Sequence, residues 1–349
     1  MVAALGSAAV VTSALVSPQA AFAFNIFPQG SAILAYADGQ TGNLMIRLPG
    51  GQITDTHRQV SPGTSPSITG LLVTGHWEVA FREANSQHLW LMGQDLAPRD
   101  TGSFIQPNTS PAITTLTNGN FEVAFNGPGN HLFQGDSHSG GDTGSFIAPG
   151  TSPSIAPTAV QTYEVTWVGP GNVVWEGGPT GGGHIAANAT GGVVEASDGS
   201  SPSISGIPGG SFKGPNFGIA IHGLNNFATA IDNTDKAIPS ISVVAPGTNM
   251  ASGANPYTSV PFSYSFQHAG DGHLIQTNSG SGTIDSGLKM RPGSSPASAT
   301  VNNGTIDAFV NADTGTLWTW NDDSLKGIET GLKVAANTNP SIATLYTVS

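Results

Sequence analysis

The hexapeptide DTGSFI occurs twice in the sequence, at Asp100–Ile105 and Asp142–Ile147. In aspartic proteases an Asp-Thr-Gly loop carries each of the two carboxylates that share a proton. Such a dyad needs each Asp to follow an apolar strand and the two to meet across two lobes. Here the preceding residues are Ala-Pro-Arg and Ser-Gly-Gly, typical of loops, and the copies are 42 residues apart. These features argue against a proteolytic dyad.

The hexapeptide belongs to a longer repeat. Its clearest segment reads PGTSPSI at 62–68 and 149–155, PNTSPAI at 107–113, DGSSPSI at 198–204, PGSSPAS at 292–298 and ANTNPSI at 336–342. Either Pro239 or Met250 could mark a seventh unit. The intervals between the second prolines of successive units are 45, 42, 49, 48, 46 and 44 residues if Met250 takes this place in the fifth unit. With Pro239 instead, two of the intervals become 37 and 57. We therefore place the seventh unit at Met250.

An acid recurs eleven residues before the second proline of five units, as Asp55, Asp100, Asp142, Asp285 and Glu329. Acids at one position of separate repeats cannot converge on a single dyad. We expect these side chains to accept hydrogen bonds from nearby backbone N–H groups in a tight turn, where Gly permits the unusual backbone.

Each unit also contains two runs typical of β-strands. The first alternates in polarity, at 77–81, 121–125, 163–167 and 306–309, and the second lies at 88–90, 131–133, 173–175, 273–275 and 316–318. Gly, Asn, Asp and Pro separate the runs, which indicates hairpin turns. The PSI segment and the segment that follows Asp-Thr-Gly supply two more strands. Each unit of about 45 residues therefore predicts one four-stranded propeller blade.

The two ends of the chain complement each other. Residues 340–345 read as a lone first strand, whereas the segments 32–36, 43–45 and 55–60 begin with a second strand. We predict an all-β, seven-bladed propeller of four-stranded blades, closed by one blade shared between the termini. The predicted blades are 66–110, 111–152, 153–201, 202–249, 250–295, 296–339, and 340–349 with 27–65. The alternative, an open stack of sheets, leaves both half-blades unpaired.

Composition limits both the secondary structure and the classes of molecule that the protein can be expected to bind. The 47 Gly and 24 Pro residues predict almost no helix. Only 9% of residues are charged, the net charge is −12, and no basic cluster exists, which argues against nucleic acid and anionic membrane surfaces as partners. The absence of Cys excludes disulfides and Cys metal sites.

The first 23 residues are apolar, rich in small residues, and end in Ala21-Phe22-Ala23. This pattern predicts a signal peptide at 1–23, a single mature domain at 24–349 and secretion. The alternative is a membrane anchor, but Ser13 and Ser17-Pro18 interrupt the run short of the roughly 20 apolar residues that a span needs. We expect no membrane span.

The repeat resembles that of secreted actinobacterial proteins in which units like PGTSPSI, YEVAF and LW recur, sometimes beside wall-acting or hydrolytic domains. More distantly, it is similar to the tectonin and tachylectin group of lectin propellers. The resemblance covers residues 27–349, and it implies the propeller architecture. A shared fold does not by itself determine a ligand.

Aromatic rings and amides recur near the hairpin turns, and sugars are held by a ring against their C–H face with polar groups at their hydroxyls. The candidate ligand-binding residues are Gln87, His88, Asn130, His131, Asn172, His273, Thr316 and Trp320. Alternatively, the rings of Trp90, Phe133, Trp175 and Trp318 pack between blades. Several weak sites on one rigid disc would gain through multivalency.

Four acids, Glu78, Glu122, Glu164 and Asp307, share one strand position. They could ring one end of the central channel and bind Ca²⁺, or each could pair with a neighbouring blade. The histidines form no metal motif, since His88, His131 and His273 occupy equivalent positions of different blades. No other cofactor is expected.

These patterns predict a secreted, monomeric, non-catalytic protein that binds glycans or cell-envelope polysaccharide. A protein-interaction scaffold is one alternative. A propeller glycosidase or lyase is another, and it needs two carboxylates facing one pocket. The Gly-rich insert at 177–190 in the third blade is a place where a special site could lie.

Overall fold

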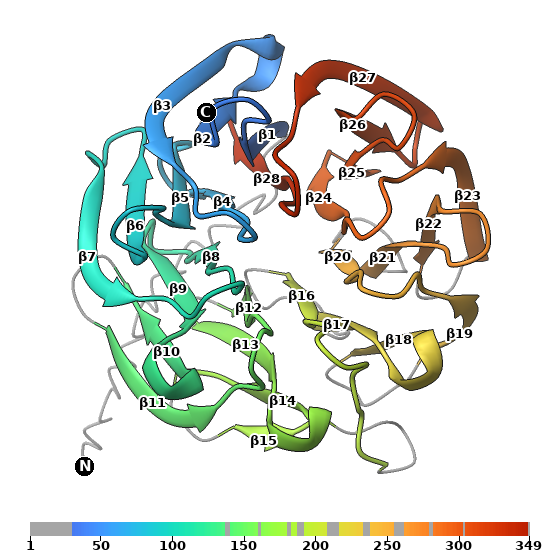
Figure 1. The fold of residues 1–349 in the computed structure, drawn as a ribbon, viewed down its shortest axis with the longest axis horizontal. Helices are drawn as coiled ribbons and strands as arrows, with labels where there is room; N and C mark the ends of the chain where they lie inside the picture. Colours follow the sequence, from blue (N-terminus) through green and yellow to red (C-terminus); the bar gives the residue numbers. More distant parts are fainter. Residues whose placement is uncertain are drawn as a thin grey trace, which may run out of the picture.

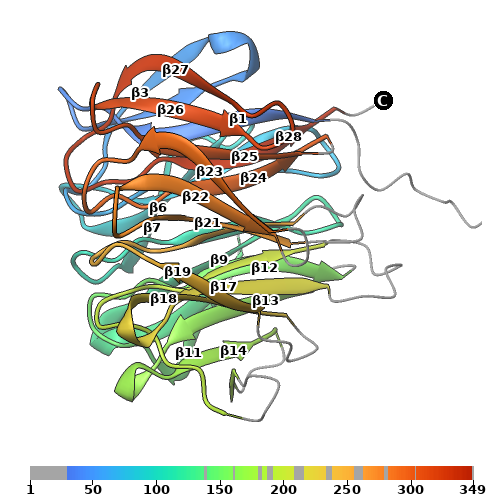
Figure 2. The same cartoon turned by 90° about the vertical axis from the view of Figure 1, so that its right-hand side faces the viewer.

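The computed structural model describes residues 30–136, 140–159, 162–179, 183–186, 192–207, 216–232, 238–254, 262–278, 282–302 and 304–347. These residues form seven four-stranded antiparallel sheets around a common axis (Figure 1). Seen from the side, the strands run between two faces of the disc (Figure 2). The predicted seven-bladed, all-β propeller is confirmed. Helix is limited to four short 3₁₀ turns within the described ranges, η1 (Pro49–Gly51), η2 (Pro128–Asn130), η3 (Pro170–Asn172) and η4 (Leu224–Asn226).

The blades are built in sequence order. The shared blade contains β28 (Ser341–Tyr346), β1 (Gly30–Ala37), β2 (Asn43–Arg47) and β3 (Ile53–Gln59). The first contains β4 (Ser67–Gly70), β5 (Trp77–Arg82), β6 (His88–Gly93) and β7 (Arg99–Phe104). The second contains β8 (Ala112–Thr115), β9 (Phe121–Asn126), β10 (His131–Gly135) and β11 (Gly140–Phe146).

The remaining blades follow the same order. The third contains β12 (Ser154–Ala159), β13 (Thr162–Val168), β14 (Val174–Gly177) and β15 (His184–Ile185). The fourth contains β16 (Ser203–Gly206), β17 (Phe217–His222), β18 (Phe227–Asp232) and β19 (Ile238–Val243). The fifth contains β20 (Ala251–Ala254), β21 (Phe262–Gln267), β22 (His273–Asn278) and β23 (Gly282–Lys289). The sixth contains β24 (Ala297–Val301), β25 (Gly304–Val310), β26 (Thr316–Asn321) and β27 (Lys326–Lys333).

The shared blade closes the ring as the ends of the sequence predict. β28 pairs antiparallel with β1, and Ile342 lies opposite Leu34. The strand from the C-terminus is therefore the innermost strand of a blade whose other three strands come from the N-terminal part. Pairing both ends removes the exposed sheet edges of an open stack.

The residue before the second proline of each repeat joins neighbouring blades. The backbone N–H of Ser65 donates to Ser110 Oγ at 2.8 Å, and the same bond continues around the axis until Asn339 N–H donates to Ser65 Oγ at 2.9 Å. Its members, here named the serine ring, are Ser65, Ser110, Ser152, Ser201, Asn249, Ser295 and Asn339. Each position therefore needs a side-chain acceptor, and this need explains the TSP motif. Because Asn249 is a member and β20 begins just after Met250, the register based on Met250 is confirmed.

Breaking one bond of the serine ring tests this explanation. We expect Ser110→Ala to lower the free energy of unfolding by about 1 kcal/mol, because the Ser65 N–H loses its acceptor. Ser110→Asn should retain most of the stability, as Asn249 does in the fifth unit. Urea unfolding of the three proteins measures the difference, and equal losses for Ala and Asn would contradict the role of the acceptor.

The first strands line the axis, and the other strands build the core between blades. The axial cavity holds about 220 Å³ and is lined by residues of all seven first strands, including Thr69, Thr114 and Ser298. Large apolar side chains such as Phe81, Tyr264 and Phe309, all on second strands, are fully buried between neighbouring sheets. The described residues include no helix long and apolar enough to cross a membrane.

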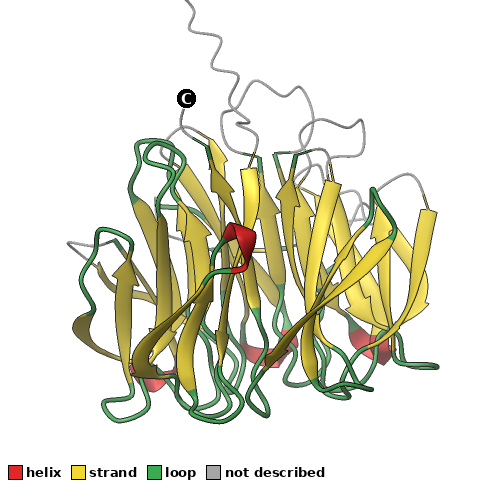
Figure 3. Cartoon of the chain, turned by 90° about the horizontal axis from the view of Figure 1, so that it is seen from above, coloured by secondary structure: helices red, strands yellow, loops and turns green. Residues whose placement is uncertain are grey.

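Because neighbouring strands are antiparallel, the turns between second and third strands share one face with the loops that join blades. Backbone bonds connect the two kinds of loop, as from Ile105 N to Gln87 O at 3.1 Å and from Ile147 N to Asn130 O at 2.7 Å. We name this side the turn face. Short helices of the turn face lie along the lower edge of Figure 3.

Candidate functional site

The repeated DTG segment forms a β-bulge in the fourth strand. Asp100 Oδ1 accepts a bond from Gly102 N–H at 2.8 Å, and Gly102 has a φ of 72°. Thr101 Oγ1 donates to Leu89 O at 2.8 Å, and the strand register shifts between His88 and Trp90. The acid therefore bonds the local backbone, as the sequence predicts, but within an outer strand rather than in a connecting turn.

The acid of each bulge also contacts the first residue of the third strand. The His88 Nδ1–Asp100 Oδ1 distance is 3.1 Å, and the His131 Nδ1–Asp142 Oδ2 distance is 2.7 Å. Equivalent pairs are Asn43–Asp55 at 3.0 Å, His273–Asp285 at 3.1 Å and Thr316–Glu329 at 2.8 Å. Four of the predicted ligand residues, His88, His131, His273 and Thr316, thus bind an acid of their own blade.

The other predicted residues mostly lie in the turns. Gln87, Asn130 and Asn172 have φ values of 61°, 59° and 62°. Gln87 Oε1 accepts a bond from the buried Arg82 at 2.9 Å, and Asn172 Nδ2 donates to Asp198 at 2.5 Å. The eight predicted residues are spread over five blades and do not form one site. As contacts to a ligand, all of them except Trp320 stay predictions.

Trp320 requires a correction. Its side chain is only 2% exposed and belongs to a core cluster with Leu274, Met290 and Phe309. The ring fills the space between the fifth and sixth blades, so it is not available at the surface. Its burial depends on side chains of the neighbouring blade, which the local sequence does not reveal.

The four strand acids also differ from the predicted ring around the channel. Glu78, Glu122, Glu164 and Asp307 lie on second strands, whereas the axial cavity is lined by first strands and contains none of them. The alternative, pairing with a neighbouring blade, holds for two. Glu122 interacts with Tyr163 of the third blade, and Asp307 Oδ1 accepts a bond from Ser265 of the fifth at 2.7 Å.

A groove between the first and second blades combines apolar and polar groups. It holds about 390 Å³, within the usual range of ligand pockets, about 300–1,000 Å³. Leu91 and Phe125 form part of its buried wall. The half-buried ring of Phe133 also lines it and stacks on Phe125, with 5.3 Å between ring centroids and 26° between planes.

Charged groups lie beside this ring. Arg99 and Asp100 are exposed on β7, whereas the side chain of Gln134 faces the third blade, where its Oε1 accepts a bond from Tyr163 at 3.2 Å. Slight burial acts to raise the pKa of Asp100, but hydrogen bonds from Gly102 N–H and His88 outweigh it and hold the pKa below its usual value. Asp100 is therefore ionised at neutral pH. The groove offers a cation and an anion beside an aromatic ring.

The groove is open because a small residue stands three places after Asp100. The equivalent positions in five blades are Arg58, Ser103, Ser145, Leu288 and Leu332. Arg58 covers the Trp90 ring, with its Cζ 4.5 Å from the ring centroid, and Leu288 packs in one cluster with Trp318. Ser103 is too short to cover Phe133 in this way, so the space above the Phe133 ring is part of the groove.

Sequence reasoning missed these residues because it treated Phe133 as one of several equivalent rings. The signal was present, since DTGS in two units replaces DTHR, DSGL and ETGL in the others. The effect of this residue depends on which aromatic ring of the next blade it faces. The sequence of one strand does not show which side chains of neighbouring blades meet. The insert at 177–190 lies partly outside the described residues, and its described part supplies β15.

No protein-family profile matches the chain, and no curated protein matches it. Among solved structures, the chain is similar to the fucose-recognising lectin of Aleuria aurantia, described as a six-bladed β-propeller, with 13% identity and a TM-score of 0.52 over 77% of this chain and 95% of the lectin. The SapL1 lectin in complex with α-methyl fucoside gives 14% identity and a TM-score of 0.52 over 78% and 97%. AofleA from Arthrobotrys oligospora gives 11% and 0.50 over 82% and 90%. At these identities the likeness shows the fold, and the chain is a β-propeller.

Proposed function

We propose that this protein is a carbohydrate-binding propeller and that the groove between its first and second blades holds a saccharide. The main observation behind it is the Phe133 ring, left uncovered by Ser103 beside Arg99 and Asp100. A sugar ring has an apolar C–H face, which suits an aromatic side chain, and hydroxyls that both donate and accept hydrogen bonds. The groove supplies both kinds of surface.

Each polar side chain has a distinct role in this proposal. The ionised Asp100 accepts bonds from two sugar hydroxyls, and the Arg99 guanidinium donates to hydroxyl or ring oxygens. His88 holds Asp100 in place through contacts of 3.1 Å from Nδ1 to each carboxylate oxygen, so the acid is oriented before a ligand arrives.

Multivalency is a further part of the proposal. Ser145 holds the position of Ser103 in the second blade, and Trp175 of the third holds the position of Phe133. A second saccharide site between these blades would add avidity on a surface that repeats the same glycan. The named lectins support the sugar class, because the Aleuria aurantia lectin recognises fucose and SapL1 is in complex with α-methyl fucoside.

Secretion, a cell-envelope polysaccharide as target and a monomeric state also belong to the proposal. The expected signal peptide at 1–23 lies outside the described residues. The low charge and the lack of a basic cluster favour neutral polar ligands over nucleic acid. A saccharide surface is such a ligand.

A glycan array that includes fucosides and cell-wall polysaccharides tests the proposal. We expect the wild-type protein to bind a defined sugar and Phe133→Ala to bind it at least about tenfold more weakly, the loss typical of a central contact residue. The matched control is Met45→Ala, at the equivalent position of the shared blade, where Leu332 belongs to the same apolar cluster. A blank array with folded protein, or equal losses for the two variants, would overturn the proposal.

A further inference from the structure

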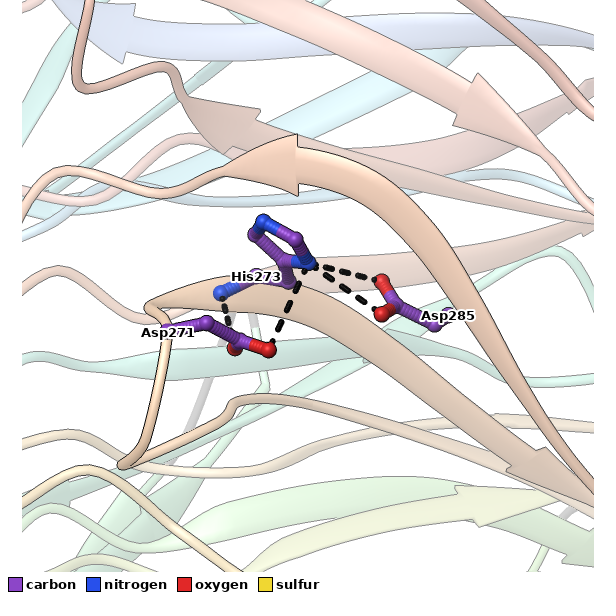
Figure 4. Close-up of side chains that lie close together, drawn as sticks. All are labelled: Asp271, His273 and Asp285. Carbon is purple, nitrogen blue, oxygen red and sulfur yellow. Dashed lines mark hydrogen bonds and ion pairs between the residues drawn. The ribbon is translucent and has the colours of Figure 1, made fainter.

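Two imidazoles and two carboxylates meet on the fifth blade. The His273 Nδ1 atom lies 3.1 and 3.2 Å from the two oxygens of Asp285 and 3.6 Å from Asp271 Oδ2. Figure 4 shows the two carboxylates on either side of this nitrogen. The other oxygen of Asp271 contacts His268 Nδ1 at 2.8 Å. One ligand atom each from Asp271, His273 and Asp285 lies within 4.8 Å of the others.

Other blades provide an internal comparison for this cluster. Their hairpin begins with an acceptor, and a hydroxyl residue stands three places later, in the pairs Asp38–Thr41, Glu83–Ser86 and Asn311–Thr314. In each pair the first side chain accepts bonds from the backbone of the turn. In the fifth blade the chemistry is reversed, with His268 first and Asp271 at the hydroxyl position.

The reversal adds a second carboxylate to the His–Asp pair that the repeat already provides. In the first blade, His88 faces Asp100 alone, and Ser86 stands where the fifth blade has Asp271. In the fifth blade one nitrogen faces both acids, yet a single N–H can be donated fully to only one of them. A bound cation satisfies all three groups at once.

The distances from the imidazole nitrogen suit a small tetrahedral ion. Zn²⁺ holds nitrogen and carboxylate oxygen at about 2.0–2.2 Å, so neighbouring ligand atoms lie about 3.3–3.5 Å apart in a tetrahedron. The observed separations from His273 Nδ1 to the nearest oxygens are 3.1 and 3.6 Å. Imidazole together with carboxylate favours zinc and its neighbours over Ca²⁺, which takes oxygen ligands.

We propose that Asp271, His273 and Asp285 bind a divalent transition-metal ion such as Zn²⁺, with His268 orienting the Asp271 carboxylate. His268 would then be a hydrogen-bond partner that holds a ligating carboxylate in place. Bonds from the backbone N–H groups of His273 and Gly287 fix the two acids, at 3.0 and 2.8 Å. The side chains of Asp271, His273 and Asp285 are 43%, 22% and 50% exposed, so solvent or a ligand hydroxyl can complete the coordination.

Isothermal titration of the metal-stripped full chain with Zn²⁺, checked by elemental analysis, tests the site. We expect one ion per chain. Asp271→Ser, which installs the residue of the first blade, should weaken binding by at least tenfold, because even residues that only orient ligands contribute about 10–100-fold. Co²⁺ in place of Zn²⁺ should give a visible absorption spectrum that His273→Gln alters.

The matched control is Asp142→Asn, which changes an equivalent His–Asp pair that lacks the third group. It should leave Zn²⁺ binding unchanged, and circular dichroism checks that each variant is folded. Absence of Zn²⁺ binding by the wild-type chain, or equal affinity for wild type and Asp271→Ser, would overturn the proposal. The result is independent of saccharide binding, because the groove lies between other blades.

Discussion

Replacing Ser103 by Arg should abolish saccharide binding while the propeller stays folded. The shared blade already carries this arrangement, since Arg58 holds the equivalent position and its Cζ lies 4.5 Å above the Trp90 ring. In the variant, the guanidinium would take the place of the sugar over Phe133. Covering the ring removes both the stacking surface and the free space of the groove.

Three variants at this one position separate steric closure from other causes. Ser103→Leu reproduces the residue that accompanies Trp318 in its core cluster and should also prevent binding. Ser103→Ala removes the hydroxyl but leaves the groove open, so its affinity should stay within a few-fold of wild type, the cost of one neutral hydrogen bond. Isothermal titration with the sugar identified on the array measures all three. Full binding by Ser103→Arg would place the ligand elsewhere.

The free energy of unfolding should fall as the pH is raised from about 5 to about 8. Burial raises the pKa of Glu78, Glu122 and Glu164 from 4.5, and that of Asp307 from 3.8, to about 7. The folded protein therefore retains protons that the unfolded chain releases. The stabilising contribution of each acid is fully present below its pKa in the unfolded chain. It is lost as the pH rises through the pKa in the folded protein, by up to roughly 3 kcal/mol per group.

Glu78 is the acid with which to test this dependence. It is 5% exposed, and its Oε2 atom has no hydrogen-bond partner among the described residues. Glu78→Gln should flatten the fall in stability and leave the protein more stable than wild type at about pH 8, because a neutral amide carries no buried charge. Urea unfolding at several pH values gives the slope.

Glu83 in the same blade is the matched control. Bonds from Asn85 and Ser86 outweigh its burial and hold its pKa below 4.5, so it is ionised in both states throughout this range. Glu83→Gln should lower the unfolding free energy at every pH without changing the slope. A slope that is the same in wild type and Glu78→Gln would refute the role assigned to the buried acid.

Much of the architecture was predictable because it repeats. The seven repeat markers predicted the number of blades, and the half-units at 27–65 and 340–349 predicted the shared blade. The DTG acid was correctly interpreted as a backbone acceptor, because the same residue in five units cannot serve one catalytic centre. The TSP motif was recognised as a marker, but its role in the serine ring required coordinates.

The candidate sites were less predictable for a physical reason. Trp320 and Phe133 are both aromatic residues of third strands, yet one is buried and the other lines a groove. The zinc candidate was missed because Asp271 stands at no repeated acidic position, and only the structure places it beside His273 and Asp285. In each case the deciding neighbour lies on another strand or another blade.

The sequence alone determined the fold class, the number of blades and the closure of the ring, because strand alternation and turn chemistry are local and recur in every unit. Only the tertiary structure decided which rings are covered, which acids are buried and which histidines meet two carboxylates. The exposure and the electrostatic environment of a side chain depend on residues that approach it from neighbouring strands and blades. A repeat pattern specifies the positions of those strands but not how their side chains pack against one another.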